Sequence, residues 1–268
     1  ESLNSSEIEK ILEQIDLDDE YSLKDQSSVI KLIQNINPEH TLKIFDVDTM
    51  VEFSIITLKS RIDSLRESSI DVINNWRIVI EEAEKWENDS SLTLKAQQFQ
   101  MVLSDTDMYA KVRGAEYNRL FESNPTGLSY VYYKKILKSF YTDNPRINSI
   151  MSKYHSDMVL LRKLLNGSSE LLLAVFVLLL IDTTANVESI RKLKLSNFQN
   201  DGEAPEIVWF KGRDNRFHRK ILDRKNVNDR QLIVAIEVLK KSLEFVRTQS
   251  NNKDNDNLFI QRYKNNIT

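Results

Sequence analysis

Basic side chains are concentrated in the stretch 207–225, which could bind the phosphates of a nucleic acid. It carries seven lysines and arginines against two aspartates, whereas residues 1–25 carry nine acidic residues against two lysines. The basic residues of this stretch are Lys211, Arg213, Arg216, Arg219, Lys220, Arg224 and Lys225. Cationic side chains bind a phosphate backbone by displacing its counterions, so the stretch is a candidate nucleic-acid contact. The alternative is a solvated strand edge whose charges discourage strand pairing.

Two further groups of basic residues are candidates for the same chemistry. The first lies on the polar face of a short amphipathic helix and consists of Arg191, Lys192 and Lys194. The second interleaves with aromatic residues and consists of Lys134, Lys135 and Lys138. Exposed aromatics can stack on bases, but helical spacing favours Tyr133 and Phe140 on a buried stripe, which leaves the lysines as the candidate phosphate contacts.

A succession of short elements positions these residues. The apolar run 171–181 predicts a helix that is buried on most of its surface. Capping side chains at 182–184 precede a short helix with Val187 and Ile190 on its apolar side. Residues 207–210 and 217–222 have strand composition and flank a turn that contains Gly212, which predicts a β-hairpin. A long amphipathic helix is expected over 232–246.

The chain as a whole is predicted to be mainly α with a small β-hairpin, an α+β protein. It has 268 residues, enough for two domains, and only five glycines and four prolines. We expect a helical amino-terminal domain over 1–166, with apolar stripes at 8–15 and 29–36, and a second domain over 167–268. The boundary is predicted at Asn166 and Gly167, in a short flexible link.

Composition excludes several kinds of chemistry. The chain has no cysteine, which rules out disulfides and thiol catalysis and is compatible with a cytoplasmic location. Its three histidines, His40, His155 and His218, lack the spacing of metal ligands. There is also no glycine-rich phosphate loop. Because both of these patterns are missing, neither a metal nor a nucleotide cofactor is expected. We find no signal peptide and no apolar run of the ~20 residues that a membrane span requires.

The order of these elements resembles the catalytic domain of the tyrosine recombinases, the family that includes the phage integrases. The resemblance covers 170–259, where an apolar helix runs into a first motif and is followed by a hairpin and a helix ending in Leu-Phe. The corresponding segments are IDTTANVESIRKLKLSNF, EIVWFKGRDNRFHRKIL and VLKKSLEFVRTQSNNKDNDNLF. The resemblance implies a helical domain and a catalytic domain that close around double-stranded DNA and self-associate on it. It also implies DNA recombination through a tyrosyl-phosphate intermediate, without metal or nucleotide.

The chain departs from the family pattern at the residues that carry the chemistry. Asn186 stands where the family has an arginine that contacts the scissile phosphate, and an amide cannot supply its charge. The family's hairpin lysine corresponds to Arg213, which stays protonated and is a poor general acid. Lys211 could take that role only with a shifted hairpin register. The family's histidine-x-x-arginine motif and nucleophilic tyrosine are not found after 259, and Tyr263 has the wrong context.

Two explanations of these departures are open: a fragment cut before the second half of the active site, or a recombinase fold that has lost its chemistry. In either case we expect this chain to bind DNA without cleaving it, with Arg213, Arg216 and Arg219 on phosphates. The alternative function is that of a non-catalytic helical scaffold whose acidic amino end binds a protein partner.

Overall fold

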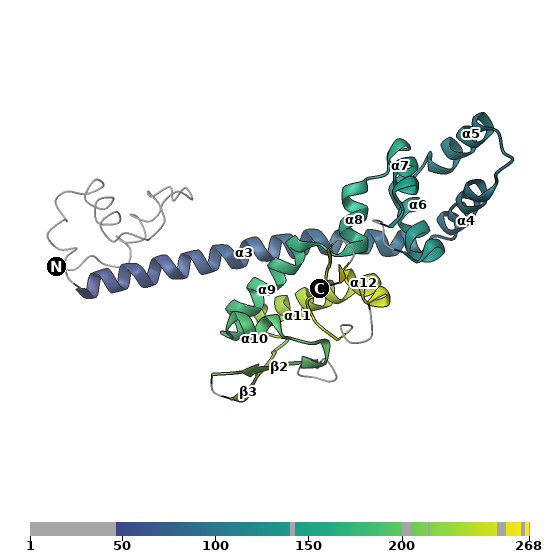
Figure 1. Ribbon diagram of the computed structural model, residues 1–268. Helices are drawn as coiled ribbons and strands as arrows, with labels where there is room; N and C mark the ends of the chain where they lie inside the picture. Colours follow the sequence, from purple (N-terminus) through teal and green to yellow (C-terminus); the bar gives the residue numbers. More distant parts are fainter. Residues whose placement is uncertain are drawn as a thin grey trace, which may run out of the picture. The chain divides into compact units, whose positions relative to one another are not determined.

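The computed structural model describes residues 47–139, 143–199, 205–213, 215–250, 256–263 and 266–267 (Figure 1). It is mostly helical with a small antiparallel sheet, which confirms the predicted mainly α character. The predicted stripes at 8–15 and 29–36, the acidic segment 1–25, His40 and Phe140 lie outside the described residues. The chain divides into two compact units, Glu1–Leu65 and Arg66–Thr268. The boundary expected at Asn166 and Gly167 lies within the second unit and stays a prediction.

Helix α3, Val47–Asn88, belongs to both units. In the first unit it carries exposed apolar side chains spaced four and three residues apart, at Val51, Ile55, Leu58, Ile62 and Leu65. In the second unit one face of the helix is buried in the core, at Ile73, Trp76, Ile80 and Ala83. One helix therefore presents an exposed apolar stripe in one unit and a core face in the other.

The helices that follow α3 enclose an aromatic core. They are α4 (Ser90–Ser104), α5 (Ala110–Phe121), α6 (Pro125–Val131), the π-helix η2 (Tyr132–Leu137), α7 (Pro145–Lys153) and α8 (Met158–Asn166). Side-chain oxygens cap three of them, from Asp89, Asn124 and Asp157. In the core, Phe99 meets the rings of Phe121 and Tyr132 edge-on, at centroid distances of 5.2 and 4.8 Å.

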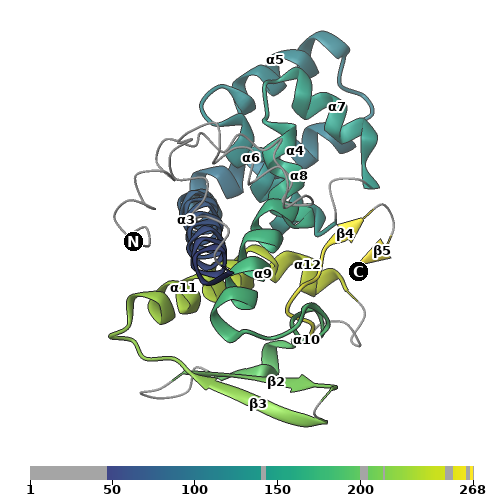
Figure 2. The same cartoon turned by 90° about the vertical axis from the view of Figure 1, so that its left-hand side faces the viewer.

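Helix α9, Ser169–Thr183, is the buried apolar helix that the sequence predicts. Leu171, Leu178 and Leu179 on it have no exposed surface. It packs against α11 (Val227–Ser242), and α10 (Val187–Arg191) follows at its carboxyl end (Figures 1 and 2). Helix α12 (Glu244–Gln249) comes after α11. In the part of the chain that the structure describes, no single helix is long and apolar enough to cross a membrane; α8 and α9 meet that test only as a pair, bent by 48°.

The junction between α8 and α9 is a capped turn. Gly167 has a φ of 89°, a region that favours glycine, and its carbonyl accepts a hydrogen bond from Gln261 Nε2 at 3.2 Å. Ser168 is buried and its hydroxyl caps α9 by accepting from the Leu171 amide at 3.4 Å.

The predicted hairpin is present as part of a three-stranded antiparallel sheet of order β1-β2-β3. Its strands are β1 (Phe198–Gln199), β2 (Glu206–Lys211) and β3 (Arg216–Ile221), and the 3-10 helix η4 (Leu195–Asn197) precedes β1. Strand β3 forms one edge of the sheet, and the hairpin lies below α10 in Figure 2. Two further short strands, β4 (Arg262–Tyr263) and β5 (Asn266–Ile267), pair antiparallel.

A buried ion pair joins α3 to the carboxyl end of α9. Arg66 Nη1 bonds one carboxylate oxygen of Asp182, and Arg66 Nη2 lies 3.2 Å from the other. Only 12% of the Arg66 side chain and 6% of the Asp182 side chain are exposed. Arg66 Nη2 also lies 3.4 Å from the carbonyl oxygen of Asn228 on α11. Charges buried in this way must be paired, so the contact fixes three helices against one another.

Replacing Asp182 by alanine is expected to lower the free energy of unfolding by about 3–5 kcal/mol, because it leaves the Arg66 charge buried without its carboxylate. The double variant Arg66→Met, Asp182→Leu is expected to recover most of this stability, since it removes both charges. Urea unfolding followed by circular dichroism measures both effects. The exposed pair Arg77–Glu81 on α3 supplies the control, Arg77→Ala, which should change little. Equal destabilisation of the single and double variants would contradict this account.

Candidate nucleic-acid interface

Asn186 forms the amino end of α10. Its backbone is extended, and its side-chain Oδ1 accepts a hydrogen bond from the Ser189 amide at 2.7 Å. The residue is exposed. Because the carbonyl oxygen caps the helix, the side chain's other polar group is the neutral amide nitrogen, which can donate but carries no charge. The residue predicted to replace the family's arginine is therefore an N-cap in this structure.

A hydrogen bond fastens α10 to the hairpin. The Ser189 hydroxyl donates to the carbonyl oxygen of Phe210 at 2.7 Å, and Ser189 is buried. Lys211, the next residue after Phe210, is half-buried at the end of β2. The structure thus brings the amino end of α10 and Lys211 onto neighbouring segments. Arg213 lies beyond them, exposed in the turn.

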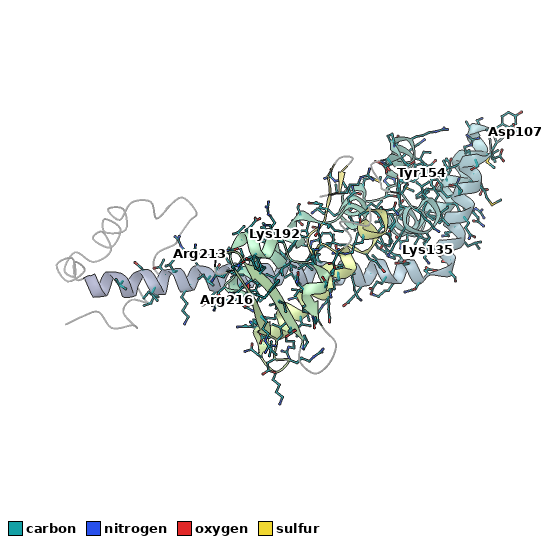
Figure 3. All side chains as sticks on the ribbon, turned by 60° about the horizontal axis from the view of Figure 1, so that its bottom comes forward. Asp107, Lys135, Tyr154, Lys192, Arg213 and Arg216 are labelled. Atoms are coloured by element: carbon teal, nitrogen blue, oxygen red, sulfur yellow. The ribbon has the colours of Figure 1, made fainter. Side chains whose placement is uncertain are left out.

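The turn of the hairpin presents arginines to solvent. Lys211 pairs with Arg216 in the strand register, and the Asn215 amide lies 3.4 Å from the Gly212 carbonyl oxygen. Asn215 has a φ of 52°, which asparagine tolerates better than most residues. Figure 3 shows Arg213 and Arg216 on the hairpin and Lys192 at the end of α10. Arg213, Arg216 and Arg219 are exposed, and no acidic residue in the described ranges forms an ion pair with them.

Strand register assigns the basic residues to two faces. Trp209 is buried on the inner face, where its ring stacks on His218 at a centroid distance of 5.9 Å. Because successive side chains of a strand point to opposite faces, Arg216 shares this inner face with His218, whereas Arg219 points outward. The sequence predicts these arginines as one group of phosphate contacts, and the register separates them.

Lys220 is engaged within the structure. Its Nζ lies 2.7 Å from Asp229 Oδ1 and donates to the Asp182 carbonyl oxygen at 3.2 Å. Only 26% of its side chain is exposed. Lys220 therefore ties β3 to α9 and α11, and the predicted contact with DNA would have to replace this ion pair.

Arg191 and Lys192 share one carboxylate at the surface. Glu188 Oε2 lies 2.9 Å from Arg191 Nη2, and Glu188 Oε1 lies 2.8 Å from Lys192 Nζ. Lys192 and Arg191 hold the pKa of Glu188 below its ordinary value, so the carboxylate stays ionised at neutral pH. Lys194 is exposed, and its backbone pairs with Asn257. These three predicted contacts lie beside the hairpin, but two of them are partly neutralised by Glu188.

Lys134 and Lys135 of the second group lie on η2, and Lys138 follows its last residue. Figure 3 shows Lys135 away from the hairpin arginines Arg213 and Arg216. Lys134 Nζ lies 2.6 Å from Glu87, and Lys135 Nζ bonds the Glu87 carbonyl oxygen. Burial lowers the pKa of Lys134, but Tyr130 and Glu87 outweigh this effect and hold it above the ordinary value. Lys138 is exposed and ends η2 in the left-handed conformation, with a φ of 49°. Of the three, Lys138 presents its side chain most openly to a ligand.

The tyrosines of this region are buried, as the favoured interpretation predicts for Tyr133. Tyr130, Tyr132 and Tyr133 are 6%, 1% and 0% exposed, which excludes them as stacking surfaces in this conformation. The hydroxyl of Tyr132 donates to Gln100 Oε1 at 2.5 Å. Burial raises the pKa of Tyr132 to about 12.

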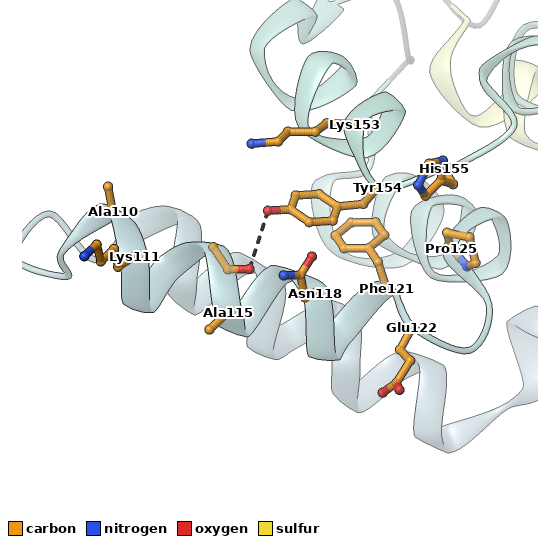
Figure 4. Close-up of a pocket in the computed structure, with 11 residues that line it drawn as sticks. Ala110, Lys111, Ala115, Asn118, Phe121, Glu122, Pro125, Lys153, Tyr154 and His155 are labelled. Carbon is orange, nitrogen blue, oxygen red and sulfur yellow. Dashed lines mark hydrogen bonds between the residues drawn. The ribbon is translucent and has the colours of Figure 1, made fainter.

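A cleft of about 720 Å³ lies between α5 and the turn after α7 (Figure 4). Phe121 and Tyr154 stack in its wall at a centroid distance of 5.4 Å, and the Tyr154 hydroxyl lies 3.5 Å from the Gly114 carbonyl oxygen. Lys153 Nζ lies 5.8 Å from the Tyr154 ring. No local sequence pattern indicates this cleft, because its walls come from segments about 40 residues apart.

No protein-family model matches this chain, and no curated protein or solved structure matches it. The functional assignment therefore depends on the chain's own residues and their geometry.

Replacing Asn186 by alanine is expected to lower the free energy of unfolding by about 1 kcal/mol, because the Ser189 amide loses its capping oxygen. Asn186→Asp should keep the wild-type stability, since aspartate caps as well as asparagine. Thermal or urea unfolding of the three proteins distinguishes the outcomes. An alanine variant as stable as the wild type would show that the cap contributes nothing.

Proposed function

We propose that this chain is a DNA-binding protein of the tyrosine recombinase type that binds double-stranded DNA without cleaving it. The observation that carries the proposal is the exposed basic end of the hairpin, with Arg213 and Arg216, held next to α10 by the bond between Ser189 and Phe210. Arginine donors on a fixed support suit phosphate oxygens, because the planar guanidinium binds them in a defined geometry.

The chemistry of Asn186 and Arg213 explains why binding would not lead to cleavage. Asn186 is a neutral N-cap, so it cannot replace an arginine that stabilises charge on the scissile phosphate. Losing one such donor costs roughly a hundredfold to a thousandfold in rate. Arg213 stays protonated at neutral pH, so it cannot act as the general acid.

The proposal includes a clamp, in which the helical part of the chain contributes a second DNA contact and copies associate on the DNA. Of the second group of lysines, Lys138 is best placed for that contact, because its side chain is exposed. Lys134 and Lys135 both bond Glu87. The clamp and the association rest on the family resemblance.

The decisive experiment measures binding to a labelled DNA duplex across a salt series. The triple variant Arg213→Ala, Arg216→Ala, Arg219→Ala is expected to bind more weakly than the wild type. Its slope of log affinity against log salt should fall by about one for each phosphate that is no longer neutralised. The same reactions, run on denaturing gels, should show no covalent protein–DNA adduct.

A matched control removes three exposed arginines elsewhere in the same unit, at Arg119, Arg146 and Arg162. It changes the net charge equally, so an equal drop in affinity would mean that overall charge and not the hairpin binds DNA. No binding by the wild-type chain at low salt would exclude the proposed function.

A second candidate function, that of a helical interaction module, is favoured by the exposed stripe of α3. Val51, Ile55, Leu58, Ile62 and Leu65 follow the spacing of a coiled-coil seam, which a partner helix would cover. Binding through such a stripe would change little with salt, unlike phosphate contacts.

Replacing Glu188 by glutamine is expected to strengthen DNA binding severalfold and to steepen its salt dependence. The substitution removes a negative charge and releases Arg191 and Lys192 from their shared carboxylate. Because the pKa of Glu188 is lowered, the gain should be the same from about pH 6 to pH 8. Fluorescence anisotropy at several pH values measures it. Unchanged or weaker binding would place α10 away from the DNA.

A further inference from the structure

The outer face of the hairpin exposes apolar side chains where a solvated strand would carry polar ones. Phe217 is 73% exposed, Ile221 55% and Phe210 45%. Phe210 and Phe217 pair directly across the strands, with ring centroids 5.3 Å apart and planes tilted by 60°. The two rings therefore form one continuous aromatic surface at the end of the hairpin.

Arg219 lies in the middle of this face. It pairs with Val208 across the strands, and Phe217 and Ile221 are its same-face neighbours along β3. The remaining residue of the face is Glu206, at the end farther from the turn. An exposed arginine therefore stands beside an exposed aromatic pair, with Arg213 in the adjoining turn.

This composition suits a nucleic acid better than a protein. Protein interfaces also contain arginine and phenylalanine, but burying Arg219 against a protein surface would strip its water unless the partner supplied a carboxylate as counter-charge. A DNA strand suits both kinds of side chain on this face. Each nucleotide carries a flat base that stacks on an aromatic ring and a phosphate that accepts hydrogen bonds from a guanidinium.

Resting on the proposed DNA-binding function, we propose that the outer face of β2 and β3 binds unpaired DNA bases. Phe217 and Phe210 stack on the bases, and Arg219 and Arg213 neutralise the adjacent phosphates. In an intact duplex each base is stacked between its neighbours, so these rings have no free base to contact. The face therefore adds a preference for single-stranded or locally opened DNA to the duplex binding of the hairpin's arginines.

The test compares the binding of the full chain to a duplex, to the same duplex with a central mismatched bubble, and to one of its strands. Phe217→Ala should weaken binding to the bubble and to the single strand by about tenfold, the effect typical of removing one base stack, and leave duplex binding nearly unchanged. Phe217→Trp should retain the preference, whereas Phe217→Leu, which keeps apolar bulk without an aromatic face, should abolish it. Tyr109, 83% exposed at the amino end of α5, supplies the control Tyr109→Ala, which should have no effect.

Each contrary result has a distinct meaning. Absence of binding to all three DNAs would remove the proposed function and this inference with it. Duplex binding that depends on the hairpin arginines, with no weakening in Phe217→Ala for any DNA, would keep the function and overturn the inference. Full retention by Phe217→Leu would overturn base stacking in favour of apolar burial. A lower oligomeric state of Phe217→Ala in sedimentation, without a change in DNA binding, would overturn the inference by assigning the face to a second copy of the chain.

Discussion

The arrangement of the second unit depends on a set of buried charges at the carboxyl end of α9. The Asp182 carboxylate binds Arg66 from α3, while the Asp182 carbonyl accepts from Lys220 of β3, which pairs in turn with Asp229 of α11. Removing charges from water is costly, and only reciprocal pairing at close distance offsets the cost. These contacts therefore define where the hairpin stands relative to the helical core, with a directionality that apolar packing alone would not give.

Several of the basic residues fall into two classes, those bonded within the fold and those exposed on the hairpin. Lys220, Lys134 and Lys135 are bonded within the fold, whereas Arg213, Arg216 and Arg219 remain exposed on the hairpin. Asn186 and Ser189 use their side chains to shape α10 and to join it to β2. Asn186 and Ser189 therefore have structural roles in α10, and neither side chain carries a charge.

Local pattern was sufficient to predict α9, the hairpin and the mainly helical character, because each follows from the spacing of nearby apolar residues. Strand alternation places Arg219 and Lys220 on opposite faces of β3, but local pattern could not show that Lys220 pairs with Asp229 of α11. It could not anticipate the contact of Lys134 with Glu87, whose partners lie 47 residues apart, nor the cleft beside Tyr154. Their prediction would require knowledge of how distant helices meet, which no short window of sequence contains.

The position of β3 at the edge of the sheet also bears on the solubility of the protein. An edge strand offers unpaired backbone groups, and here it carries the highly exposed Phe217, a combination that promotes strand-to-strand aggregation. Arg216 and Arg219 flank that ring on the same strand and act as charged gatekeepers by mutual repulsion between approaching copies. The cations of this edge are therefore constrained by colloidal stability as well as by any ligand, because each of them adds to the repulsion between approaching copies of β3.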